Sequence, residues 1–412
     1  MIDFEKYKLN NGLTVILQPD TTTPIAAVNI CYNVGSRDEN PQKTGFAHLF
    51  EHLMFGGSKN IPDYDMQLQK VGGENNAFTN TDITNYYLTI PIENLETALW
   101  LESDRMNELA FSSKSLEVQR NVVIEEFNQS YLNQPYGDLM LLLKPLAYKV
   151  HPYQWNTIGK TPEHIKNATM EDVKNFFYTF YRPNNAVLTI SGNLDIDKCK
   201  TMIDKWFSSI KAGNIYHRNL PQEPIQNEAR YLEIKRHVPC PCICKAYKMG
   251  KRTDNDFYAT DLLSDILSNG DSARLPKALI NDNPLFSSIN AEVLGSFDNG
   301  LLLILGYLNP NVDIKKADKA IENQIDILCQ KTISETELTK VKNKVKTVLD
   351  FAELSIQDKA LNLSIFEIMS RAEDINDEEY KYTSISPSVL QDIAQKVFNP
   401  NNCSTIYYNP ID

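Results

Sequence analysis

Two histidines and a glutamate stand close together in residues 48–52, within the apolar stretch 45–55. Glu51 and His52 follow His48 by three and four residues. On a helix with 3.6 residues per turn these positions share one face, so two imidazoles and a carboxylate would converge on one point. Imidazole is a common zinc ligand, and a carboxylate beside it can serve as a base. The spacing therefore predicts a zinc site on a helix, in the order His-x-x-Glu-His rather than the commoner His-Glu-x-x-His.

A second helix is expected to supply a third ligand. Catalytic zinc usually has three protein ligands and one water, and a carboxylate complements two neutral histidines. Residues 113–131 have a helical pattern with Ser112 or Ser113 as its cap, and Glu125 and Glu126 lie at its centre. Acids within a buried stripe are costly unless they are paired, and a metal would remove that cost; the alternative is a solvated acidic pair on an exposed edge. The apolar stripe of this helix consists of Leu116, Val122, Val123 and Phe127.

Over essentially its whole length the chain resembles the pitrilysin/insulinase family of zinc peptidases, which includes the mitochondrial processing peptidases. Members of that family carry their third ligand in an Arg-x-Val-Val-x-x-Glu helix, which begins here at Arg120 and ends at Glu126. The resemblance implies that His48, His52 and Glu126 hold one zinc ion per chain. At Gln119 the sequence departs from many relatives, which have an acid there. Other segments that resemble the family are 72–79, 134–137, 151–153, 158–159 and 181–185.

The resemblance implies hydrolysis of peptides. Bound zinc lowers the pKa of water towards about 7 and polarises the scissile carbonyl. Glu51 faces the same way as the histidines, but the zinc already has its three protein ligands without it. We therefore expect Glu51 to be the general base. The alternative for Glu51 is an ordinary acid on a helix surface. For the whole protein, the alternatives are a non-catalytic core or structural subunit and a peptide-binding chamber.

The substrate is expected to bind along a strand made of Asn76, Ala77, Phe78 and Thr79. These residues follow a Gly-Gly turn, and residues 84–90 after them are rich in strand formers. In the enzymes that the chain resembles, the corresponding strand is an open edge that pairs with an extended peptide. The alternative is an ordinary sheet strand with Asn76 in a turn.

An internal repeat divides the chain. Tyr-Arg-Pro-Asn-Asn at 181–185 recurs as Phe-Asn-Pro-Asn-Asn at 398–402, which is an offset of 217 (400 − 183). We therefore expect an α+β fold with two tandem homologous units, each a mixed or antiparallel sheet backed by helices. The zinc-bearing unit would be 1–212, the polar and proline-containing segment 213–227 a linker, and the second unit 228–412. The resemblance implies that the two units form half of a clamshell chamber.

The second unit is expected to be catalytically silent. A second repeat, at an offset of 214, places Leu262, Asp265 and Ile266 opposite the three motif residues, and apolar side chains cannot bind zinc. In the family, the second half often provides an Arg and, seven residues on, a Tyr; the matching positions here are Ile280 and Ser287. The resemblance thus implies a homologous partner that supplies this pair in a heterodimer, and a homodimer is the alternative.

Composition excludes other classes of function. The net charge of −12, without a basic stripe, argues against nucleic-acid binding, and no apolar run is long enough to span a membrane. The first residues lack the pattern of a signal peptide, and seven scattered cysteines favour reduced thiols, so we expect a cytoplasmic protein. Cys240, Cys242 and Cys244 alternate along a strand and are expected to be buried thiols; metal binding is the alternative.

Overall fold

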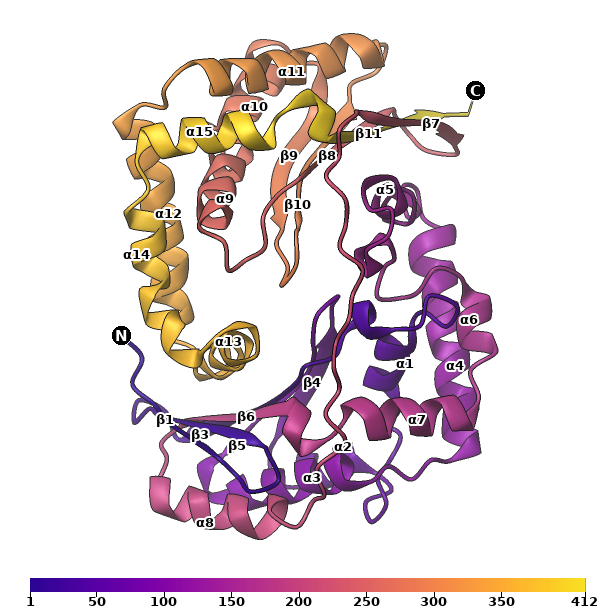
Figure 1. Ribbon diagram of the computed structural model, residues 1–412, viewed down its shortest axis with the longest axis vertical. Helices are drawn as coiled ribbons and strands as arrows, with labels where there is room; N and C mark the ends of the chain where they lie inside the picture. Colours follow the sequence, from indigo (N-terminus) through magenta and orange to yellow (C-terminus); the bar gives the residue numbers. More distant parts are fainter. Residues whose placement is uncertain (412) are drawn as a thin grey trace. The chain divides into compact units, whose positions relative to one another are not determined.

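A computed structural model describes residues 1–411 and contains two compact units, each built on one β-sheet (Figure 1). Unit 1 comprises Met1–Gln129, Trp155–Leu220 and Asp350–Asn376. Unit 2 comprises Ser130–Gln154, Pro221–Leu349 and the chain from Asp377 onward. Both sheets are mixed and backed by helices, which confirms the expected α+β fold. Within residues 1–411, no helix is both long and apolar enough to cross a bilayer.

The sheet of unit 1 has six strands in the order β1-β2-β6-β3-β5-β4. Strands β2 and β6 are parallel, and all the other neighbours are antiparallel. Strand β4 therefore lies at one edge and pairs only with β5. The strands are β1 (Glu5–Lys8), β2 (Thr14–Pro19), β3 (Ile25–Tyr32), β4 (Glu74–Thr79), β5 (Thr84–Pro91) and β6 (Ala186–Gly192).

Helices cover both faces of this sheet (Figure 1). Helix α13 packs on β3 and β6, while α3 packs on β5 and against α8. Helix α1 contacts β4, β5 and α4, which brings two helices of the predicted metal site together. The helices of unit 1 are α1 (Phe46–Leu53), α2 (Tyr64–Gln69), α3 (Leu95–Asn107), α4 (Ser113–Phe127), α6 (Pro162–Lys166), α7 (Met170–Phe180), α8 (Ile196–Phe207) and α13 (Ile356–Met369).

The sheet of unit 2 repeats this topology. Its order, β7-β11-β8-β10-β9, corresponds strand by strand to β2-β6-β3-β5-β4, with one parallel pair at the same place. Strands β6 and β11 begin 217 residues apart (403 − 186), which is the offset of the sequence repeat. The strands are β7 (Arg230–Arg236), β8 (Cys242–Lys248), β9 (Phe286–Leu294), β10 (Leu301–Leu308) and β11 (Cys403–Pro410). The helices are α5 (Leu139–Ala147), α9 (Asn255–Ser268), α10 (Arg274–Pro276), α11 (Ile314–Gln330), α12 (Glu335–Ala352, which ends in unit 1), α14 (Glu378–Thr383) and α15 (Pro387–Val397).

The division of the chain differs from the expected 1–212, 213–227 and 228–412, because two segments are exchanged between the halves of the sequence. Helix α5 lies in the first half but packs on β7, β8 and β11, where Leu143 joins a core with Cys244 and Ile406. Helix α13 lies in the second half but packs on the sheet of unit 1, where Leu363 is fully buried. Each helix covers an apolar sheet face that would otherwise be exposed to water.

Candidate metal centre

Helix α1 presents the motif on its less buried side. The chain enters the helix through Gly45, whose φ of +88° is in the left-handed region. His48 and His52 keep 14% and 24% of their side-chain surface exposed. The opposite face packs into unit 1, so the helix cannot rotate without exposing apolar side chains. The buried residues of that face are Phe46, Ala47, Leu49, Phe50 and Leu53.

Helix α4 carries Glu126. Ser112 caps the helix by accepting a hydrogen bond from the Ser115 N–H, as predicted, and the chain continues past it as a π-helical turn at Asn128–Leu132. The predicted stripe was partly wrong: Val122 is 43% exposed, and only one narrow face of α4, formed by Leu116, Val123 and Phe127, is buried. The Glu126 side chain is also 43% exposed, so it is not an acid within a buried stripe.

The three predicted ligands converge. The Nε2 atoms of His48 and His52 are 3.3 Å apart, and Glu126 Oε2 lies 3.7 Å from each. With Zn–N and Zn–O bonds of about 2.0–2.2 Å, tetrahedral geometry requires ligand atoms about 3.3–3.5 Å apart. The donor set therefore fits a zinc ion with small adjustments. In residues 1–411 it is the one cluster of three such side chains with this spacing.

Burial controls the charge of the site. It lowers the pKa of His48 to about 4, with a further contribution from His52, so this imidazole is neutral and able to bind a metal at neutral pH. Burial also raises the pKa of Glu51 above its ordinary value. The Thr79 hydroxyl and His52 oppose that rise, and the charge of Glu126 adds to it. A carboxylate with a raised pKa beside the ligands is suited to accepting a proton.

The predicted substrate residues lie on the edge strand β4. In the register of the sheet, Asn76 is opposite Tyr87 and Ala77 is opposite Tyr86 of β5. No other strand in residues 1–411 pairs with β4, so one edge of it is free of strand pairing, and the Ala77 N–H donates to Asn76 Oδ1 instead. Because α1 packs against β4, this free edge belongs to the same part of unit 1 as the three ligands.

The corresponding helix of unit 2, α9, carries no ligands. Leu262 and Ile266 are fully buried in the core of unit 2, and Asp265 accepts a hydrogen bond from Asn269. At the positions matched to the family's Arg and Tyr, Ile280 packs against that core and Ser287 donates to the Tyr307 carbonyl.

The predicted cysteine strand is β8, but it begins at Cys242, and Cys240 lies before it and is only partly buried. Cys242 and Cys244 are buried there, and burial raises the pKa of both thiols. Protonated thiols are poor metal ligands, so the strand has the character of a core strand.

Sequence reasoning missed Glu39. This buried carboxylate accepts hydrogen bonds from the backbone N–H groups of Gly45 and Ala47, where α1 begins. Its partners at α1 are backbone groups, which leave no pattern of residue types, and its third partner, the Trp155 indole N–H, is far away in the sequence. The available signal was an acid six residues before a glycine that must start a helix.

Comparison with known proteins decides the family. The family model for insulinase (peptidase family M16) matches residues 14–157, and the model for the peptidase M16 inactive domain matches residues 167–345. The chain is 30% identical to the zinc protease PqqE of Helicobacter pylori over 414 residues, which covers 98% of this chain and 93% of that protein. The chain belongs to the M16, or insulinase, family of peptidases. The names of its bacterial relatives give zinc as a metal of this family.

Solved M16 structures share the fold. A protease from Helicobacter pylori matches with a TM-score of 0.93 and 28% identity, and the alignment covers both chains completely. The periplasmic protease PqqL from Escherichia coli matches with a TM-score of 0.82 at 18% identity, which shows the fold alone. That alignment covers 99% of this chain but 48% of PqqL, so the M16 fold seen here accounts for about half of PqqL.

Proposed function

We propose that the chain is the zinc-bearing subunit of a metallopeptidase that hydrolyses peptides within a dimeric chamber. The observation that carries this proposal is the spacing of His48 Nε2, His52 Nε2 and Glu126 Oε2, which suits one zinc ion. Bound zinc would supply Lewis acidity for a water molecule and for the scissile carbonyl. As in the expectation from the sequence, the proposed location is the cytoplasm, which the seven free cysteines favour.

Glu51 is the general base of this proposal. It lies on α1 between the two histidines, and its raised pKa favours uptake of a proton from the attacking water. The same carboxyl group then delivers the proton to the leaving amine. The free edge of β4, from Asn76 to Thr79, holds the peptide through main-chain hydrogen bonds, which depend little on substrate side chains.

The proposed enzyme needs a second half. Neither Ile280 nor Ser287 can provide the guanidinium or phenol that the family uses. In this proposal, a homologous subunit supplies the corresponding Arg and Tyr in a heterodimer. One further fact supports an assembly: PqqL is about twice as long as this fold. The loss of one oxyanion donor commonly lowers the rate by about 100-fold or more, so the lone chain or a homodimer should be slow.

The alternative is a non-catalytic core subunit or a peptide-binding chamber. The match to the inactive-domain model favours it, but a scaffold has no use for a base beside three converging ligands. To separate these functions, the purified chain would be assayed for bound zinc and for cleavage of a quenched peptide, with and without co-purifying subunits. The proposal expects about one zinc per chain and cleavage that rises with the partner. Zinc-free protein, or peptide binding without any product, would establish the alternative.

A further inference from the structure

Glu39 is a carboxylate buried inside unit 1 with no lysine or arginine of residues 1–411 paired to it. Its Oε2 accepts from the Gly45 N–H at 2.9 Å and from Trp155 Nε1 at 3.1 Å, and its Oε1 accepts from the Ala47 N–H at 2.9 Å. Burial raises the pKa of Glu39 to about 8, and these three donors oppose that rise. A buried acid without a counterion is costly, so these N–H groups are what stabilise it here.

The start of α1 cannot be capped by its own residue. A Cβ on Gly45 would lie 2.7 Å from the Ile158 carbonyl oxygen and 2.8 Å from Ile165 Cδ1, and φ is positive. The position therefore requires glycine, which has no side-chain acceptor. The N–H groups of a first helical turn need acceptors from outside the helix. Glu39 provides them from six residues upstream, through one oxygen to the Gly45 N–H and the other to the Ala47 N–H.

Helix α1 has eight residues, and His48 directly follows the Ala47 amide that Glu39 binds. Each residue of a helix advances by 1.5 Å and turns by about 100°, so a shift of α1 by one residue along and about its axis would move both imidazoles away from Glu126. We infer that Glu39 is the positioning residue of the metal-binding helix: by seating its first turn, it sets the ligand geometry before a metal arrives. This inference rests on the proposed function for its role in catalysis.

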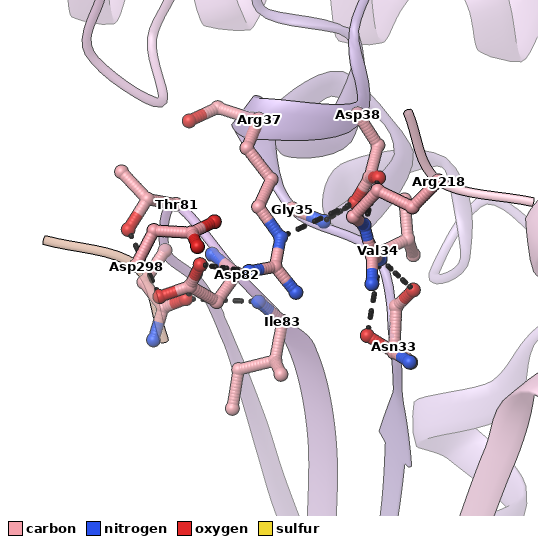
Figure 2. A network of polar contacts seen from close by, with 12 residues as sticks. Asn33, Val34, Gly35, Arg37, Asp38, Thr81, Asp82, Ile83, Arg218 and Asp298 are labelled. Atoms are coloured by element: carbon pink, nitrogen blue, oxygen red, sulfur yellow. Dashed lines mark hydrogen bonds and ion pairs between the residues drawn. The ribbon is translucent and has the colours of Figure 1, made fainter. Parts of the chain in front are cut away.

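The loop that carries this carboxylate is itself held by ion pairs (Figure 2). Arg218 donates to both oxygens of Asp38, whose side chain is fully buried, at 2.7 and 3.1 Å, and also to the Asn33 carbonyl. On the other side, Arg37 pairs with Asp82 at 2.8 Å. Arg218 belongs to the segment that leads out of unit 1. The loop before α1 is thus anchored at both sides, and Arg218 supports the seating of the helix indirectly.

The test uses the full-length chain with Glu39→Gln. Glutamine keeps the size and one acceptor oxygen, but it turns an amide donor towards one of the N–H groups of α1. We expect the zinc Kd, measured by competition with a chromogenic chelator, to weaken about 10–100-fold, as is typical for groups that orient metal ligands. In the metal-free protein, we expect faster hydrogen exchange of the amides of Phe46–Leu53.

The matched control is Asp195→Asn, which makes the same carboxylate-to-amide change at the cap of α8 in the same unit, where Asp195 accepts from the Lys198 N–H. It should leave the zinc Kd and the exchange of α1 at wild-type values. An unchanged Kd and unchanged α1 exchange in Glu39→Gln would overturn the inference. If that variant does not fold, Arg218→Gln is used, and unchanged values there overturn it. If the wild-type chain binds no zinc, the proposed function fails, and exchange in the metal-free variants still decides whether Glu39 seats α1.

Discussion

Replacing Glu223 by glutamine is expected to destabilise unit 2, because this side chain fixes the turn after α5. Its carboxylate accepts from the backbone N–H groups of Lys149, Val150 and His151 at 2.9–3.0 Å and from Lys248 Nζ at 2.7 Å. The side chain is 6% exposed. Burial alone would raise the pKa of Glu223, but the hydrogen bond from Lys248 and those from the backbone lower it to about 2.

The magnitude follows from linkage. For Glu223, a pKa of about 2 in the folded state against 4.5 in the unfolded state corresponds to about 3 kcal/mol of folding free energy at pH 7. Partial screening by solvent of the contacts around this carboxylate reduces the contribution to about 2 kcal/mol. Because the folded pKa is the lower one, the stabilisation is complete above pH 4.5 and is lost as the pH falls through 2. Urea unfolding of wild type and Glu223→Gln should therefore differ by about 2 kcal/mol at pH 7 and by roughly half of that near pH 3.

The control for this measurement is Glu228→Gln, an exposed acid in the same segment, which should change the free energy of unfolding by no more than about 0.5 kcal/mol. The reasoning would be refuted if the difference in the free energy of unfolding between wild type and Glu223→Gln did not change with pH. A difference at pH 7 as small as that of the control would refute it as well.

Two further predictions concern the site and the exchanged helix. Glu51→Gln should retain about one zinc per chain while lowering peptide cleavage by about 100-fold or more, whereas His52→Ala should lose the metal as well; metal analysis and a quenched-peptide assay separate them, and unchanged cleavage by Glu51→Gln would exclude the proposed base. Leu363→Ala should destabilise unit 1 by about 2–5 kcal/mol in urea unfolding, because this fully buried side chain of α13 packs on its sheet, while the exposed Val348→Ala should have little effect; equal effects would argue against α13 as part of the core of unit 1.

Elements with strong local patterns could be predicted from the sequence. The helical pattern at 113–131 is largely α4 (Ser113–Phe127), and the strand formers at 84–90 are β5 (Thr84–Pro91). The convergence of His48, His52 and Glu126 also followed, since helical spacing fixes two of them and the resemblance supplied the third. The helix and strand patterns are local in the sequence. The metal site is marked by histidine and glutamate, which are rare in protein cores.

The remaining features depend on tertiary structure. Nothing local in 130–154 or 350–376 indicates which sheet each segment will cover. Helix α13 even buries a polar group: Ser364 Oγ accepts from Asn29 Nδ2 at 2.9 Å and shares a hydrogen bond with Thr189 at 2.8 Å. A hydrophobic pattern assigns such a serine to the surface, whereas its partners come from strands far away in the sequence. Glu39 was missed for a related reason, because its partners at the start of α1 are backbone groups.

Helix α9 of unit 2 differs from α1 in its burial as well as in the identity of the residues at the motif positions. Leu262 and Ile266 of α9 are fully buried in the core, whereas His48 and His52 of α1 lie on a partly open face. Introducing histidines through Leu262→His and Ile266→His would therefore bury two imidazoles without access to a metal, and each would remove a packed side chain. We expect the free energy of unfolding, measured in urea, to fall by several kcal/mol, and the amount of bound zinc not to exceed that of wild type. A second zinc per chain would show that residue identity alone separates the two units; its absence would show that how deeply each helix is buried decides which unit holds the metal.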